Sequence, residues 1–268
     1  MALKIVTDSA SDTPKWIIEE FGLHVIPTPV VMDDIDYFDG STIFPEEFYD
    51  ILSNGKNIKT YHINSQMFYD NFLPYAKNND EVIYICFSTG IAGTFNAANL
   101  AKRELLESYP DFDLTIIDSK CASLGFGIAT YYALLMQRAG AGKQEIIDAI
   151  KWHCEHMEMI FTVKTLEYLL KGGRLSRTSA IAGSLLDIKP IIHVNDDGAL
   201  EPIEKVRGRQ KSLKRLLEIA GERGKDLDKQ VIGVAHGDDA ATMEYMKEQL
   251  SSRYSCKRFV DNYVGCAI

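Results

Sequence analysis

The stretch EVIYICFSTGIAGTF at residues 81–95 decides the fold. Residues 81–87 form an apolar run that is rich in the β-branched and aromatic side chains typical of strands. Hydroxyl and glycine residues follow at 88–94, and the spacing of apolar positions over 95–106 is that of a helix. The stretch therefore predicts a strand, a turn and a helix, in that order.

The same order of elements occurs on both sides of this stretch. A β-branched run at 3–7 leads through a polar turn into an amphipathic helical pattern that ends before Gly22. A strand pattern at 114–117 is followed by helical patterns at 127–138 and 144–157. Strands that alternate with helices predict a parallel sheet, and such sheets bind ligands at the carboxyl ends of their strands.

The pattern changes after residue 158. A strand at 190–194 and a strand at 200–206 are joined by the turn Asn195-Asp196-Asp197-Gly198, which predicts a β-hairpin. Further strands are expected at 159–163, 231–236 and, as an edge strand, 256–260, with helices at 165–170, 178–186, 212–221 and 240–252. We therefore predict an α/β protein of two domains, an N-terminal parallel α/β sandwich at 1–158 and a C-terminal mixed-sheet α/β domain at 159–268.

Composition and charge exclude several classes of protein. The 268 residues carry 29 Lys and Arg against 38 Asp and Glu, and a net charge of −9 has the wrong sign for a nucleic-acid-binding protein. The apolar stretch at 128–136 is much shorter than the ~20 residues of a membrane span. The five cysteines show no CxxC spacing, and the N-terminus resembles no secretion leader. We expect a reduced, cytoplasmic protein.

Three short motifs resemble reactive sites only in part. The segment 140–144 ends like a phosphate loop but lacks that motif's first Gly and final Ser or Thr, so we interpret it as a turn between helices. His153 and His156 share a helix face but would need further ligands to hold a metal, so we expect no metal site. Ser88 lacks the preceding Gly of a serine-hydrolase elbow, which disfavours that class of enzyme.

Two features indicate a site for an anion. The turn at 88–94 joins a strand to a helix, where free backbone N–H groups and the helix dipole attract anions, although plain helix capping explains it equally well. Positively charged residues also cluster in two other turns. They either bind a carboxylate, a phosphate or an acidic partner, or they are simply exposed to solvent. These cations are Lys171, Arg174, Lys205, Arg207, Arg209 and Lys211.

Together these segments resemble the DegV family, the fatty-acid-binding proteins that serve bacterial fatty acid kinase. The resemblance runs in order along the chain. It is carried by IVTDS at 5–9, PEEFY at 45–49, STGIAGTF at 88–95, IDSK at 117–120, LEYLLKGGRLS at 166–176, the segment from Gly183 to IKPI at 188–191, and KVRGR at 205–209.

The resemblance implies two α/β domains with an apolar ligand tunnel between them, which encloses one long-chain fatty acid. Carried over to this sequence, the carboxylate is held by a Thr and by the strand-to-helix turn. The fatty-acid-binding residues are then Thr60, Tyr61, His62, Ser88, Ala92, Gly93 and Thr94. The family pattern has Thr-Ser-Gln where this sequence has Thr60-Tyr61-His62, and Ser where it has Ala92, so we expect Tyr61 or His62 to replace the lost donor. The pattern continues with Gly-x-His-x-Gly-Pro-Gly, which would begin where this sequence ends.

The resemblance also implies a function without catalysis. The protein would present the carboxylate of its fatty acid to a separate ATP-dependent kinase, since no nucleotide motif is present, and it would need no cofactor and have no catalytic residue. We expect the exposed cations Lys171, Arg174, Arg207 and Arg209 to contact the kinase or the incoming phosphate. We expect a bacterial, monomeric protein of phospholipid metabolism that makes at most transient contact with a membrane surface. The alternatives are a small hydrolase or transferase that uses Ser88 or Thr94, and a lipid-responsive sensor.

Overall fold

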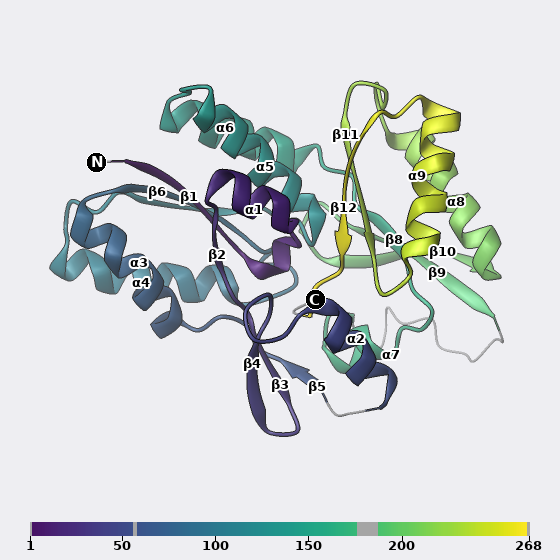
Figure 1. The fold of residues 1–268 in the computed structure, drawn as a ribbon, viewed down its shortest axis with the longest axis horizontal. Coiled ribbons are helices and arrows are strands. Elements are labelled where there is room, and N and C mark those ends of the chain that lie inside the picture. The colour runs from purple at the N-terminus through teal and green to yellow at the C-terminus, as the bar shows by residue number, and fades with distance from the viewer. Residues whose placement is uncertain (1, 56–57, 176–186, 267–268) are drawn as a thin grey trace.

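The computed structural model describes residues 2–55, 58–175 and 187–266. Its centre is a four-stranded parallel sheet with the strand order β2-β1-β6-β7 (Figure 1). The strands are β1 (Leu3–Asp8), β2 (His24–Ile26), β6 (Glu81–Cys86) and β7 (Leu114–Asp118). The sheet confirms the predicted parallel α/β fold. Because β1 and β6 are neighbours, the loops that follow these two strands lie side by side.

Helices cover both faces of this sheet because its strands are apolar on both sides. In β6, Val82 and Tyr84 pack among residues of α3 and α4, whereas Ile83 and Ile85 pack among residues of α5 and α6. All four side chains are fully buried. The helices around the sheet are α1 (Lys15–Phe21), α3 (Ser65–Asn78), α4 (Thr94–Ser108), α5 (Leu124–Arg138) and α6 (Lys143–Glu155), and a short 3-10 helix, η1 (Ser9–Ser11), follows β1.

A small antiparallel sheet that the sequence pattern does not predict lies between β2 and α3. It has the order β4-β3-β5, with β3 (Pro29–Met32), β4 (Ile35–Phe38) and β5 (Ile58–Thr60). Asp33 and Asp34, both in the left-handed region at φ 50° and 63°, form the turn between β3 and β4. Helix α2 (Pro45–Ser53) packs on one face through Phe48. This sheet matters for function because β5 ends at Thr60.

The C-terminal part contains antiparallel and parallel strand pairs in two separate sheets. The predicted hairpin is confirmed as β9 (Ile188–Val194) and β10 (Leu200–Arg207), and β8 (Ile160–Thr162) joins it in the order β10-β9-β8. The strand expected at 256–260 is β12 (Arg258–Tyr263), which pairs in parallel with β11 (Val231–His236). The helices are α7 (Glu167–Lys171), α8 (Arg209–Arg223) and α9 (Ala240–Tyr254). The helix expected at 178–186 lies outside the described residues.

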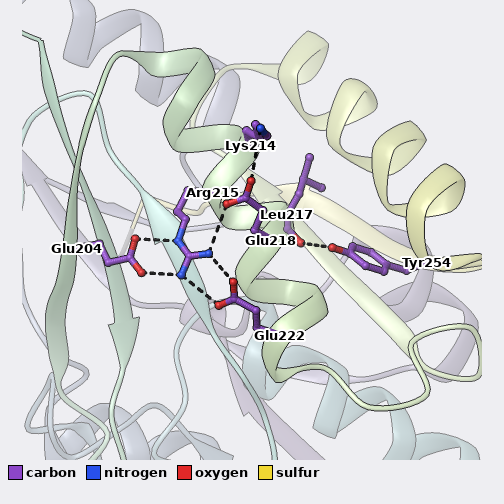
Figure 2. Close-up of polar contacts among 7 residues, drawn as sticks. All are labelled: Glu204, Lys214, Arg215, Leu217, Glu218, Glu222 and Tyr254. Atoms are coloured by element: carbon purple, nitrogen blue, oxygen red, sulfur yellow. Dashed lines mark hydrogen bonds and ion pairs between the residues drawn. The ribbon is translucent and has the colours of Figure 1, made fainter.

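One arginine joins α8 to the hairpin sheet. Arg215 donates two hydrogen bonds of 2.8 Å to the carboxylate of Glu204 on β10, and it also bonds to Glu218 and Glu222 on its own helix (Figure 2). The Tyr254 hydroxyl donates to the backbone oxygen of Leu217 at 2.8 Å and so ties the end of α9 to α8. The two C-terminal helices and β10 are thereby held as one layered unit.

The end of the chain packs back against the N-terminal part. The β11–β12 pair lies against α5, where Gly233 leaves room for Ile128 and Leu124. The Asn262 amide donates to the backbone oxygen of Asp12 at 2.8 Å, and the Tyr49 hydroxyl donates to that of Val264 at 3.0 Å. Contacts therefore cross the domain boundary expected near residue 158. No helix within 2–55, 58–175 or 187–266 is both long and apolar enough to cross a bilayer.

Candidate functional site

A small polar cavity opens where the loops after β1, β5 and β6 meet. Its volume is about 20 Å³, which is room for about one water molecule. The position fits the rule that open parallel sheets bind ligands beyond the carboxyl ends of their strands. The lining residues are Asp8, Ala10, Thr28, Tyr61, His62, Phe87, Ala92, Thr94 and Arg174. Most of the residues predicted to bind a carboxylate are among them or next to them.

The N-terminus of α4 forms one wall of the cavity. The helix begins at the buried Thr94, and its N-cap residue, Gly93, supplies no side-chain hydrogen bond. The backbone N–H groups of the first helical turn have no partner inside the helix, and the helix dipole makes this end attractive to an anion. The His62 ring packs against Gly93, since a Cβ atom placed there would lie 3.6 Å from Nε2 of His62.

Arg174, which also lines the cavity, is paired with a hydroxyl group. Arg174 Nη2 donates to Thr60 Oγ1 at 2.9 Å, and Nη1 donates to the Gly172 backbone oxygen at 2.7 Å. Because a guanidinium only donates, Thr60 accepts this bond and keeps its own O–H to donate elsewhere. Partial burial lowers the pKa of Arg174 from its usual value. No carboxylate of the described residues forms an ion pair with Arg174, although Asp8 lines the same cavity.

This placement corrects only the expected exposure of Arg174, and its expected contact with a kinase or a phosphate stays a prediction. The turn after α7 folds the chain back, with Gly173 at φ 70° and the Arg174 N–H bonded to the Leu169 oxygen at 2.9 Å. The other members of the expected patch do not line the cavity. Lys171 pairs with Glu167 at 2.6 Å, Arg209 pairs with Asp239 at 3.1 Å, and Arg207 is exposed on β10.

Ser88 is close to the cavity but does not line it. The side chain is fully buried, and its hydroxyl donates to the Gly198 oxygen at 2.7 Å while accepting from the Gly90 N–H at 3.1 Å. The hydroxyl is therefore engaged with the backbone of two turns. Among the predicted residues, the structure brings Thr60, Tyr61, His62, Ala92, Gly93 and Thr94 around the cavity and leaves Ser88 behind them.

Asp8 lines the cavity, but at the level of sequence it is used only as part of the segment IVTDS at 5–9 and is not predicted as a site residue. Its carboxylate accepts from the Tyr84 hydroxyl at 2.7 Å, from the Ala10 N–H at 3.1 Å and from the Phe87 N–H at 3.3 Å. Complete burial is the largest cause that raises the pKa of Asp8 to about 6. The signal that could have identified it is its place at the carboxyl end of a parallel strand beside β6.

The remaining sequence motifs have packing roles. The segment at 140–144 includes the turn that joins α5 to α6, with Gly140 in the left-handed region at φ 85°. His153 stacks on Tyr132 with ring centroids 4.4 Å apart, and His156 stacks on Trp152 at 4.5 Å. Throughout the described parts of the chain, no three His, Cys, Asp or Glu side chains converge in a way that could hold a metal ion.

Comparisons with known proteins agree on one family. A family model described as an uncharacterised protein of the DegV family matches residues 2–268. A DegV domain-containing protein of Clostridium perfringens is 36% identical over 266 residues, which cover 98% of this chain and 91% of that protein. The crystal structure of DegV from Bacillus subtilis, a fatty-acid-binding protein, has a TM-score of 0.87 and 28% identity, with 100% of this chain and 94% of that chain covered. A stearic-acid-binding protein of Eubacterium ventriosum has a TM-score of 0.84 and 27% identity, covering 96% and 89%.

Proposed function

The chain belongs to the DegV family, and from this premise we propose that it binds one long-chain fatty acid and holds the carboxylate between the N-terminus of α4 and the Thr60–Arg174 pair. Solved relatives at 27% and 28% identity bind fatty acids. The proposal also includes presentation of that carboxylate to a separate ATP-dependent kinase, which would form an acyl phosphate.

The observation that carries the proposal is the partly buried Arg174 guanidinium. It is hydrogen-bonded to Thr60, lines the cavity, and has no ion-pair partner among the residues described. Partial burial costs this cation some of its hydration, and an incoming carboxylate would supply both a negative charge and hydrogen-bond acceptors. The Thr60 O–H and the first N–H groups of α4 would donate to the same carboxylate.

The energetics of the ligand explain why such a site needs strong donors. Each methylene group moved from water into an apolar tunnel contributes ~0.8 kcal/mol, so a long tail favours burial by on the order of 10 kcal/mol. Burial of the carboxylate opposes this gain unless hydrogen bonds and opposite charge replace its water. The apolar tunnel that would hold the tail remains a prediction, as does its position between the two predicted domains, 1–158 and 159–268.

The enzyme alternative names Ser88 or Thr94 as its nucleophile, and the contacts of Ser88 give that residue little support in this role. The Ser88 hydroxyl donates to a backbone oxygen rather than to a base, so nothing activates it. A role as a carrier also gives the other predicted contact cations a function. Lys171, Arg207 and Arg209 would contact the kinase, while Arg174 would serve the carboxylate.

The test measures binding of octadecanoic acid and octadecanol, which share a tail and differ in the charged group. We expect the wild-type protein, stripped of lipid, to bind the acid and Arg174→Gln to bind it at least tenfold more weakly, with octadecanol affinity changed less than twofold. Arg207→Gln, which removes an exposed cation, is the matched control and should bind both as wild type does. Failure of wild-type protein to bind the acid would refute the proposed function.

A further inference from the structure

Two turns from distant parts of the chain touch through their backbones behind the carboxylate site. The Ser88 hydroxyl donates to the Gly198 oxygen at 2.7 Å, and a Cβ atom on Gly90 would lie 2.5 Å from the Gly198 carbonyl carbon. A Cβ atom on Gly198 would collide with Ser88 Oγ and lie 3.0 Å from the Cα of Lys120. The two turns can therefore come this close only because Gly90 and Gly198 have no side chain. As a result, the β9–β10 turn packs directly against the turn between β6 and α4.

Ser88 is also hydrogen-bonded to the backbone of the turn that leads into α4. Its backbone oxygen accepts from the N–H groups of Ile91 at 3.1 Å and Ala92 at 3.0 Å, and its hydroxyl accepts from that of Gly90. Its own N–H donates to the Cys121 oxygen at 3.1 Å. All hydrogen-bonding groups of Ser88 are thus used to hold the turn, so a shift of Ser88 shifts the start of α4.

Hydrogen bonds within the β9–β10 turn fix its conformation. The Asn195 side-chain oxygen accepts from the N–H groups of Asp197 at 3.1 Å and Ala199 at 3.0 Å, and the Gly198 N–H donates to the Asn195 backbone oxygen at 2.8 Å. Gly198 adopts φ 75°, which suits glycine. The turn is preorganised by its own hydrogen bonds before any contact with Ser88.

A second tether fixes the same turn to the neighbouring strand end. Lys120, just after β7, donates from Nζ to the Asp196 backbone oxygen at 3.1 Å. Asp118 accepts from the Thr89 N–H at 3.1 Å, from the Thr89 hydroxyl at 2.6 Å and from the Lys120 N–H at 3.2 Å. The β9–β10 turn is thus held at the carboxyl ends of both β6 and β7.

We propose that the β9–β10 turn positions the carboxylate-binding turn through the Ser88–Gly198 contact, so that seating of this hairpin and binding of the ligand carboxylate favour each other. Ser88 is then a positioning residue and does not touch the ligand. The part of this inference that concerns binding of a carboxylate rests on the proposed function. Because coupling between two binding events is reciprocal, the ligand must stabilise the hairpin contact as much as that contact strengthens binding of the ligand.

The first test needs no ligand and compares hydrogen exchange of the Ile91 and Ala92 amides. Ser88→Ala removes the hydroxyl, and Gly198→Ala forces the two turns apart. The control is Gly140→Ala, which has a similar left-handed φ of 85° but no atom within 4 Å of the added Cβ. We expect exchange at these amides to be at least fivefold faster in both test variants and unchanged in the control. Unchanged exchange in folded test variants would overturn the inference.

The second test uses octadecanoic acid and octadecanol with the same three variants. We expect Gly198→Ala and Ser88→Ala to bind the acid five- to twentyfold more weakly, with octadecanol affinity within twofold of wild type, and Gly140→Ala to change neither. Equal losses for acid and alcohol would make the contact general scaffolding and overturn the positioning role. If the wild-type protein bound no acid, the proposed function would fail, while the exchange measurement would still decide whether the hairpin positions the turn.

Discussion

Thr60 and Arg174 lie 114 positions apart in the sequence, yet they are hydrogen-bonded to each other at the cavity that Arg174 lines. We predict that Thr60→Val lowers affinity for octadecanoic acid by about ten- to a hundredfold, since a hydrogen bond to a charged group contributes ~1.5–3 kcal/mol. Thr60→Ser keeps the hydroxyl and should stay within threefold of wild type. Calorimetric titration provides the measurement, and an affinity within twofold of wild type for Thr60→Val would mean that Thr60 is structural only.

Asp8 makes stability depend on pH in an unusual direction. Burial raises its pKa from 3.8 to about 6, so between these values the folded state binds more protons than the unfolded state. The contribution of Asp8 to stability therefore falls as the pH rises through this window, and by linkage the loss reaches ~3 kcal/mol above it.

The Asp8→Asn variant removes this ionisation while keeping an acceptor of similar size. We predict that its free energy of unfolding rises relative to wild type between pH 4 and pH 6, then stays constant relative to wild type above pH 7. Denaturant unfolding at several pH values checks this. A difference between the two proteins that is the same at every pH would mean that Asp8 does not titrate in the folded state within this range.

At the scale of elements, Arg215 ties helix α8 to β10 through its two hydrogen bonds to Glu204 (Figure 2). We predict that Arg215→Met lowers the melting temperature by ~2–4 °C, because the two bonds to Glu204 are lost and carboxylates of α8 and β10 then face each other. Added salt should shrink the difference, since it screens both the attraction and the repulsion.

Lys214→Met is the matched control for this prediction. It removes a neighbouring cation of the same helix whose pairing with Glu218, at 3.7 Å, is long and exposed. Such pairs contribute little, so its melting temperature should lie within about 1 °C of wild type. Equal losses in the two variants would show that the total charge of α8, and not the bond to Glu204, sets its stability.

At the scale of the whole molecule, the last strand ties the C-terminal part to the N-terminal part. We predict that Asn262→Ala lowers the free energy of unfolding by ~1 kcal/mol, because the Asp12 carbonyl loses its bond to the Asn262 side chain. The control is Asn78→Ala, an exposed residue at the end of α3, which should have almost no effect. Denaturant unfolding measures both variants, and equal stability of Asn262→Ala and wild type would show that this bond does not hold the two parts together.

The parts of the fold that local patterns predict are those whose cause is local. The apolar run of β6 predicts a strand because both of its faces are buried, and the sequence Asn195-Asp196-Asp197-Gly198 predicts a turn because Gly198 adopts a left-handed φ at little energetic cost. The sheet of β3, β4 and β5 escapes prediction because its strands are only three or four residues long, too short to show a clear period.

The sequence by itself determined the α/β class and the hairpin, through local hydrophobic period and turn chemistry. Through resemblance it also predicted a carboxylate site of Thr60, Tyr61, His62, Ser88, Ala92, Gly93 and Thr94. Only the tertiary structure decided that Arg174 faces this site, that Ser88 is turned away toward Gly198, and that Asp8 is buried beside it. The physical reason is that exposure and hydrogen-bond partners depend on contacts between residues about 80 to 110 positions apart, and no local pattern of charge or hydropathy records which distant segment will cover a side chain.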